Sequence, residues 1–271
     1  MRRQKHRGLA AALIALAALL YLGWAVAGRQ VPLTIEVIAP GGDAEASNVL
    51  EEDAPTVLIY HTHTWEAYEM TEDARYTPTE TWRTKDNAHN MIRVGQALGD
   101  ALTARGFVVT HDKTAFEPPN LSAAYTRSLA MLEARQAAGE TYDYILDVHR
   151  DAYSEGSGGN TVSRGEAEAA RVMLLVGKGT GTTGSGFDVR PDWPQNLELA
   201  QAVTDAMNTV LAGVAREVRI KTGRFNQHVS TAALLIEVGN NRNTLEEALS
   251  ACDVIAEALF TVHAQGAAIQ D

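Results

Sequence analysis

Short apolar runs alternate with longer amphipathic segments along residues 56–264, and this alternation predicts an α/β fold. The apolar runs, which we interpret as buried strands, are residues 56–60, 107–109, 144–148, 170–176, 217–221 and 233–238. The amphipathic segments, which we interpret as helices, are residues 84–105, 121–138, 197–214 and 244–264. Strands and helices in this order form a mostly parallel or mixed central sheet with helices on both faces. The residues between 151 and 165 and between 177 and 192 show no such period and are predicted loops.

The amino terminus carries a different pattern. Residues 1–7 are basic, and the 19 residues 9–27 contain no charged side chain. A helix of that length spans roughly 28 Å, which is close to the hydrocarbon thickness of a bilayer. We therefore expect residues 1–29 to form a cytoplasmic basic flank and a single transmembrane helix, with the rest of the chain outside the cytosol. The alternative is a cleaved signal peptide, because Ala25-Val26-Ala27 is typical of a cleavage site.

Residues 30–55 are polar and acidic, and we interpret them as an extracytoplasmic linker. Pro40-Gly41-Gly42 predicts a turn, and no sustained hydrophobic period follows it. Residues 56–271 are then expected to form one folded domain, which is within the usual size of a domain with a single core.

Charge and cysteine content narrow the classes of partner. The 271 residues include 23 Lys and Arg against 34 Asp and Glu, and five of the basic residues lie before residue 30. The remaining body is strongly acidic, so we expect no binding to nucleic acid, which needs a basic face. The single cysteine, Cys252, cannot form an internal disulfide, so stability is expected to come from packing.

Polar side chains occupy the carboxyl ends of three predicted strands, where active sites of such sheets lie. In chain order the candidates are His61, His63, His149, Arg150 and Glu237. Glu237 interrupts an otherwise apolar strand, and a carboxylate in that setting must be paired, neutralised or bound to a metal. Imidazoles and a carboxylate from separate strand ends are ligands that suit Zn²⁺. In such a site Glu237 would act as the general base, taking a proton from the attacking water. Arg150 is expected to orient a substrate carboxylate or to brace Glu237.

Each candidate also has a simpler explanation. A His-x-His pair alone is a weak signal, and a single strand-end histidine is more often a hydrogen-bonded surface group. Glu237 could form a structural ion pair with Arg224 or Arg242. His111 is expected to play no part in a site. We favour the metal site because packing alone seldom places such residues at three independent strand ends.

Five motifs, in order along the chain, resemble the stage II sporulation protein P family. They lie at residues 61–68, 90–95, 147–151, 226–228 and 235–248, and the last begins Leu-Ile-Glu-Val-Gly-Asn-Asn. The architecture is also similar to the zinc-dependent N-acetylmuramoyl-L-alanine amidases. The resemblance implies a membrane-anchored peptidoglycan hydrolase that cleaves the amide between N-acetylmuramic acid and L-Ala. An endopeptidase activity on crosslinked stem peptides is a further activity that the resemblance raises. It further implies a complex with a lytic transglycosylase and a polytopic membrane protein.

The resemblance also suggests roles for individual residues. By analogy His149 is a zinc ligand and Glu237 the catalytic carboxylate. His63 matches the amidases' first ligand, with His61 as the competing choice. The amidases place a ligand Glu before their first long helix, where this chain offers Asp86, and Glu66 is the other candidate. Two ligand sets therefore stay open. One is His63, Asp86 and His149, and the other is His61 or His63 with Glu66 and His149.

Overall fold

The computed structural model describes residues 54–152, 160–179 and 189–270. The predicted basic flank, membrane segment and most of the linker lie outside the described residues. Among the residues that are described, no helix is both long enough and apolar enough to span a bilayer.

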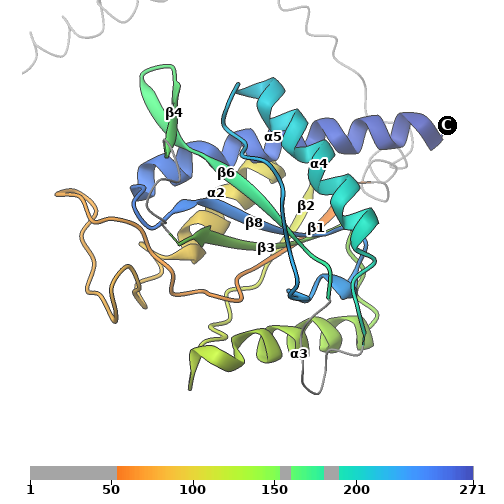
Figure 1. Ribbon diagram of the computed structural model, residues 1–271, viewed down its shortest axis with the longest axis horizontal. Helices are drawn as coiled ribbons and strands as arrows, with labels where there is room; N and C mark the ends of the chain where they lie inside the picture. The colour runs from red at the N-terminus through yellow and green to blue at the C-terminus, as the bar shows by residue number, and fades with distance from the viewer. Residues whose placement is uncertain (1–53, 153–159, 180–188, 271) are drawn as a thin grey trace, which may run out of the picture. The chain divides into compact units, whose positions relative to one another are not determined.

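A six-stranded mixed sheet forms the centre of the domain (Figure 1). Its strands, in spatial order, are β2 (Val108–His111), β1 (Thr56–Tyr60), β3 (Tyr144–Asp151), β8 (Ala233–Asn240), β6 (Val172–Gly177) and β7 (Arg219–Lys221). All neighbouring pairs are parallel except β6 with β8. The predicted α/β class with a mixed sheet is thereby confirmed.

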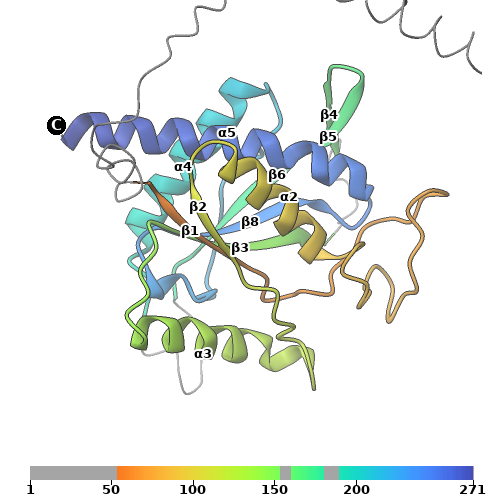
Figure 2. The same cartoon turned by 180° about the vertical axis from the view of Figure 1, so that it is seen from behind.

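Helices cover both faces of this sheet (Figures 1 and 2). On one face lie α2 (Met91–Thr103), α4 (Trp193–Val210) and α5 (Leu245–Gln270), and on the other lies α3 (Ala124–Ala137). Two short 3₁₀ turns complete the described helices, η1 at Leu121–Ala123 and η2 at Gln227–Val229. A capping box starts α5, because Glu247 N–H donates to Thr244 Oγ1 and Thr244 N–H donates to Glu247 Oε2.

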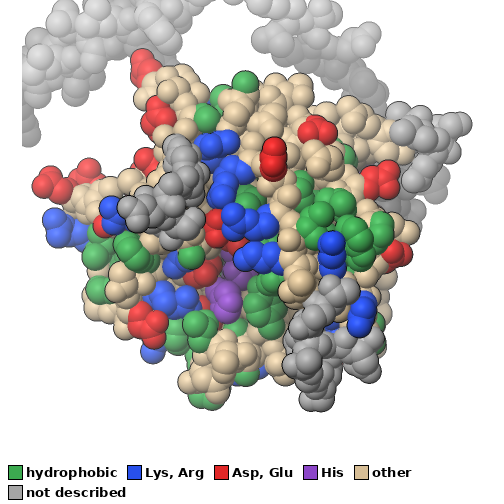
Figure 3. All heavy atoms as spheres, in the orientation of Figure 1, with side chains coloured by type: hydrophobic (Ala, Val, Ile, Leu, Met, Phe, Trp, Pro, Cys, Tyr) green, Lys and Arg blue, Asp and Glu red, His purple; other side chains and the backbone are tan. Residues whose placement is uncertain are grey.

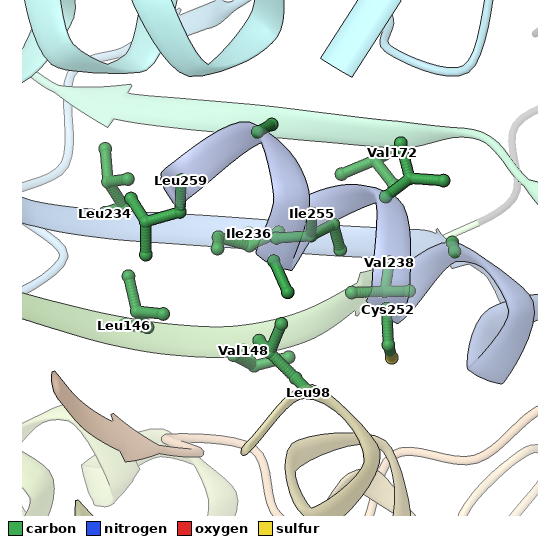
Figure 4. Close-up of a cluster of buried hydrophobic side chains, with 14 of the residues drawn as sticks. Leu98, Leu146, Val148, Val172, Leu234, Ile236, Val238, Cys252, Ile255 and Leu259 are labelled. Atoms are coloured by element: carbon green, nitrogen blue, oxygen red, sulfur yellow. The ribbon is translucent and has the colours of Figure 1, made fainter. Parts of the chain in front are cut away.

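Strand alternation divides the buried side chains between the two faces. Figure 4 shows the larger core, in which Leu146 and Val148 of β3 meet Ile236 of β8 under α5. Leu58, Tyr60 and Ile145 point the other way and pack against α3. Counting in steps of two from Ile145 in β3 and from Ala233 in β8, the later side chains of both strands also face the α3 side. The alternation thus sends Asp147, His149 and Glu237 to one face of the sheet.

Two segments differ from the sequence prediction. The helix expected over 84–105 begins only at Met91, because the side chain of Asn90 accepts a hydrogen bond from Ile92 N–H and caps it there. Residues 84–90 instead continue the loop that leaves β1. The predicted loop at 151–165 ends in a hairpin, formed by β4 (Thr161–Arg164) and β5 (Ala167–Ala170).

Candidate functional site

The carboxyl ends of β1, β3 and β8 lie together because these three neighbouring strands are parallel. Tyr60 of β1 is in register with Asp147 of β3, and His149 of β3 is in register with Glu237 of β8. His149 and Glu237, two of the residues that the sequence singled out, therefore lie side by side. Both point to the α3 side of the sheet.

Four side chains meet at these strand ends, and we call them the His149 cluster: His63, Glu66, His149 and Glu237. Glu66 Oε2 lies 3.4 Å from His149 Nδ1. The rings of His63 and His149 are in edge contact, with centroids 5.3 Å apart. Two ligands of a tetrahedral zinc ion, each at about 2.1 Å, stand roughly 3.4 Å from each other. The spacing of Glu66 and His149 is thus that of two ligands of one ion.

A second carboxylate, that of Asp147, lies on the other side of the His149 ring. Asp147 accepts hydrogen bonds from the backbone N–H and the hydroxyl of Thr62, at 2.8 and 2.7 Å. Its Oδ1 lies 2.8 Å from His149 Nε2, in ion-pair contact but off the line of a hydrogen bond. An imidazole that faces a carboxylate with one nitrogen presents the other in a fixed direction, here toward Glu66.

Arg150 contacts Glu66, whereas the sequence led us to expect that it would orient a substrate carboxylate or brace Glu237. Its backbone N–H donates to Glu66 Oε2, and its guanidinium lies 3.6 Å from Glu66 Oε1. The same guanidinium donates to the carbonyls of Ala67 and Trp82 and so fixes the loop after β1. Within the described part of the chain, its hydrogen bonds and ion pairs include none to Glu237. Arg150 is therefore a positioning residue for Glu66.

The charges of the cluster set its protonation. Burial and then the neighbouring His149 together lower the pKa of His63 to about 4, so His63 is neutral at pH 7. Burial alone would lower the pKa of His149, but Asp147 and Glu66 outweigh it and hold that pKa well above the usual value. Burial raises the pKa of Glu237 to about 8. A cation among these groups would favour the ionised form of Glu237.

Unpartnered polar atoms in the cluster test whether the residues suit a metal ion. His63 Nδ1 and Glu237 Oε2 are buried and have no hydrogen-bond partner. Such atoms are costly unless something satisfies them. No group of three or more His, Cys, Asp or Glu side chains in the described ranges is already arranged around one ion. The residue types and the spacing of Glu66 and His149 suit zinc, and the ring of His63 lies in contact with that of His149.

His61 is turned away from the cluster. It is fully buried, its Nδ1–H donates to the carbonyl of Val148 at 2.8 Å, and its Nε2 lies 2.9 Å from Nε2 of His111. Burial lowers the pKa of both rings, to about 3 for His61 and about 4 for His111. Since both nitrogens of His61 are engaged under α2, the structure favours His63 as the first ligand.

The packing of His61 against α2 predicts opposite effects for two glycines of that helix. A Cβ at Gly95 would come within 2.4 Å of His61 Nε2, whereas a Cβ at Gly99 would meet Val109 at an ordinary 3.4 Å. We expect Gly95→Ala to lower the free energy of unfolding by about 1–3 kcal/mol, because the buried imidazole cannot move aside. Gly99→Ala should be neutral or stabilising by up to about 1 kcal/mol. Urea denaturation of both variants is the measurement, and equal stabilities would contradict this packing.

Asp86 lies outside the His149 cluster. Its carboxylate accepts from the backbone N–H of Ala88 and lies 2.8 Å from His89 Nδ1. Its side chain is about half exposed, at 47%, and its hydrogen bonds stay within residues 84–89. Of the two ligand sets that the sequence left open, the structure brings together the one containing Glu66.

Three residues of the site escaped the sequence analysis. Asp147 supports His149, Tyr125 of α3 stacks over the ring of His149 at 6.5 Å, and Glu117 lies 3.8 Å from His63 Nδ1. Glu117 also pairs with Arg83 and accepts from the backbone N–H of Trp65. Asp147 could have been found by the argument used for Glu237, a carboxylate inside an apolar strand. Nothing in the sequence marks Tyr125 or Glu117.

A histidine and carboxylate cluster at the ends of parallel strands defines this chain as an α/β protein with a candidate metal centre. The family model of stage II sporulation protein P (SpoIIP) matches residues 34–260. The chain therefore belongs to the stage II sporulation protein P family. The protein of that name from Bacillus subtilis (strain 168) is 28% identical over 220 residues, which cover 76% of this chain and 51% of the relative. The chain thus spans about half the length of that relative.

Solved structures with a similar chain path include two clostridial amidases. The CwlD amidase from Clostridioides difficile, solved in complex with the GerS lipoprotein, has 12% identity and a TM-score of 0.49, with 79% of this chain and 99% of that chain covered. The N-acetylmuramoyl-L-alanine amidase from Clostridium difficile 630 has 15% identity and a TM-score of 0.46, with 78% and 96% covered. At these values the likeness assigns no activity to this chain.

Proposed function

We propose that this protein is a zinc-dependent peptidoglycan hydrolase that cleaves the amide between N-acetylmuramic acid and the L-Ala of the stem peptide. The observation that carries the proposal is the meeting of His63, Glu66, His149 and Glu237 at the ends of three adjacent parallel strands. Membership of the stage II sporulation protein P family supports the substrate class.

His63, Glu66 and His149 would hold the ion. Zinc bound there supplies Lewis-acid polarisation of the scissile carbonyl and makes water easier to deprotonate. Arg150 keeps Glu66 in place through the loop after β1, and Asp147 fixes the ring of His149. Glu237 accepts a proton from the attacking water and delivers it to the leaving amine. His63 and Glu237 are the partly exposed members of the cluster, so substrate approaches from their side.

The place of action is part of the same proposal. Residues 9–27 would anchor the domain in the cell membrane, with residues 30–55 as the linker and the catalytic domain outside the cytosol. A lytic transglycosylase and a polytopic membrane protein are proposed partners, by analogy with the family.

Release of dye from labelled peptidoglycan by the purified full chain tests the proposed activity. We expect hydrolysis that a chelator abolishes and that added zinc restores. Mass spectrometry of the fragments should find glycan without peptide, together with stem peptides that begin at a free L-Ala amine. Activity unaffected by chelation would contradict the zinc dependence. Fragments in which L-Ala stays attached to muramic acid would contradict the amidase assignment and would fit an endopeptidase.

A further inference from the structure

Three arginines line a hollow over β6 and β7, the two strands that follow Glu237 of β8 in the sheet. Arg171 precedes β6, Arg216 lies in the segment before β7, and Arg219 opens β7. Together with Met173, Glu217 and Val218 they surround about 420 Å³. Met173 of β6 is the direct cross-strand partner of Glu237 of β8, so both side chains point to the same face. The hollow and the His149 cluster therefore share one face of the sheet.

Strand register places the arginines at this location. Arg171 and Met173 are two residues apart and point the same way, and Arg219 is in register with Leu175 of β6. Arg216 N–H donates to the carbonyl of Val172, which holds its segment against β6. Figure 3 shows Lys and Arg side chains gathered in a strip near the centre of the view, beside a histidine that is visible at the surface.

The charge of the hollow is positive in an otherwise acidic body. Arg216 lies 3.1 Å and Arg219 3.9 Å from the same oxygen of Asp151, the one carboxylate within ion-pair distance of either in the part of the chain that the structure describes. Arg171 Nε–H donates a hydrogen bond to the carbonyl of Gly213. Even when Glu217 is counted, the five charged groups leave one positive charge in excess. Guanidinium groups bind carboxylates through paired hydrogen bonds, so an anionic ligand with that geometry suits the hollow.

Distance selects the part of a substrate that would reach the hollow. Two strand spacings separate β8 from β7, which is roughly 10 Å. An extended peptide advances about 3.3–3.6 Å per residue, so about three residues cover this distance. We propose that the Arg171–Arg216–Arg219 hollow binds a stem-peptide carboxylate about three residues beyond the scissile amide. This inference rests on the proposed amidase function and names a subsite for its substrate.

Two synthetic muropeptides test the proposal on the full chain. One is N-acetylmuramoyl-L-Ala-γ-D-Glu-L-Lys with a free terminal carboxylate, and the other carries a carboxamide there. The structure predicts a KM about tenfold lower for the acid, since paired, charge-assisted hydrogen bonds to guanidinium form only with the carboxylate; tenfold corresponds to about 1.4 kcal/mol. The double variant Arg216→Gln/Arg219→Gln should raise the KM of the acid about tenfold and leave kcat and the KM of the amide unchanged.

The controls separate the subsite from general charge and from folding. Lys113→Gln removes an exposed positive charge after β2, at the opposite edge of the sheet, and should leave both KM values unchanged. If the double variant does not fold, Arg219→Gln alone, at the more exposed arginine, should still reduce the preference for the acid severalfold. Equal KM values for the two substrates in the wild-type chain, or equal losses on both in the variant, would overturn the proposal.

A failure of the amidase function gives a different result. If the wild-type chain cleaves neither compound, fluorescence anisotropy with dye-labelled acid and amide muropeptides measures binding directly. Binding that favours the acid and is lost with Arg216 and Arg219 would support the subsite although the proposed reaction is wrong. Binding without preference for the acid would overturn the subsite.

Discussion

Glu237→Gln is expected to lower the rate of peptidoglycan hydrolysis by about 10²- to 10⁴-fold, the usual contribution of a general base. Glutamine keeps the size of the side chain and can still accept a hydrogen bond, but it cannot take a proton from water. The fold should persist, because Glu237 is held by strand β8 and its Oε2 makes no hydrogen bond that the substitution would break. Zinc content should also persist, because Glu237 is not one of the three proposed ligands.

The measurement is dye release with matched zinc analysis and thermal denaturation. Glu198→Gln serves as the control, since Glu198 is exposed on α4, on the far face of the sheet, and should keep full activity. A Glu237→Gln chain that folds, holds zinc and retains more than about a tenth of the activity would show that the base lies elsewhere.

Loss of zinc is the expected result of replacing any member of the ligand set by alanine. His63→Ala, Glu66→Ala and His149→Ala each remove one of the three proposed ligands of the proposed zinc ion, so zinc should fall from about one ion per chain to near none after dialysis. Activity should fall with it. Asp86→Ala should keep both zinc and activity, because Asp86 contacts only its own loop.

Metal analysis by mass spectrometry after exhaustive dialysis distinguishes the two ligand sets. Arg150→Gln is a useful companion, because it loosens Glu66 without removing a ligand and should weaken zinc binding by about 10- to 100-fold, as loss of an outer-shell partner does. Zinc retained by Glu66→Ala but lost by Asp86→Ala would contradict the arrangement of the loop after β1.

The fold was predictable where hydrophobic pattern alone decides it. Apolar runs mark β1, β3, β6 and β8 because strands buried on both faces are built mainly from apolar residues. Glu237 stands out for the same reason, and Asp147 could have been recognised in the same way. The start of α2 was not predictable from periodicity, because a single side chain, Asn90, caps the helix.

The choice between neighbouring site residues depends on direction, which spacing does not give. His61 continues the alternation of β1 and so turns under α2, while His63 lies beyond the strand and returns toward His149. Glu66 lies in the cluster because Arg150 contacts its carboxylate and donates hydrogen bonds to the carbonyls of Ala67 and Trp82 in the loop after β1. The arginine hollow combines Arg171 with a segment 45 residues later in the chain, so only the strand order brings it together.

An anomalous difference map at the zinc edge, from crystals of the protein grown with zinc, tests the central claim most directly. We expect one peak within about 2.0–2.3 Å of His63, Glu66 and His149, with the carboxylate of Glu237 beside it. A peak at Asp86 and His89, or no peak at the ends of β1, β3 and β8, would contradict it.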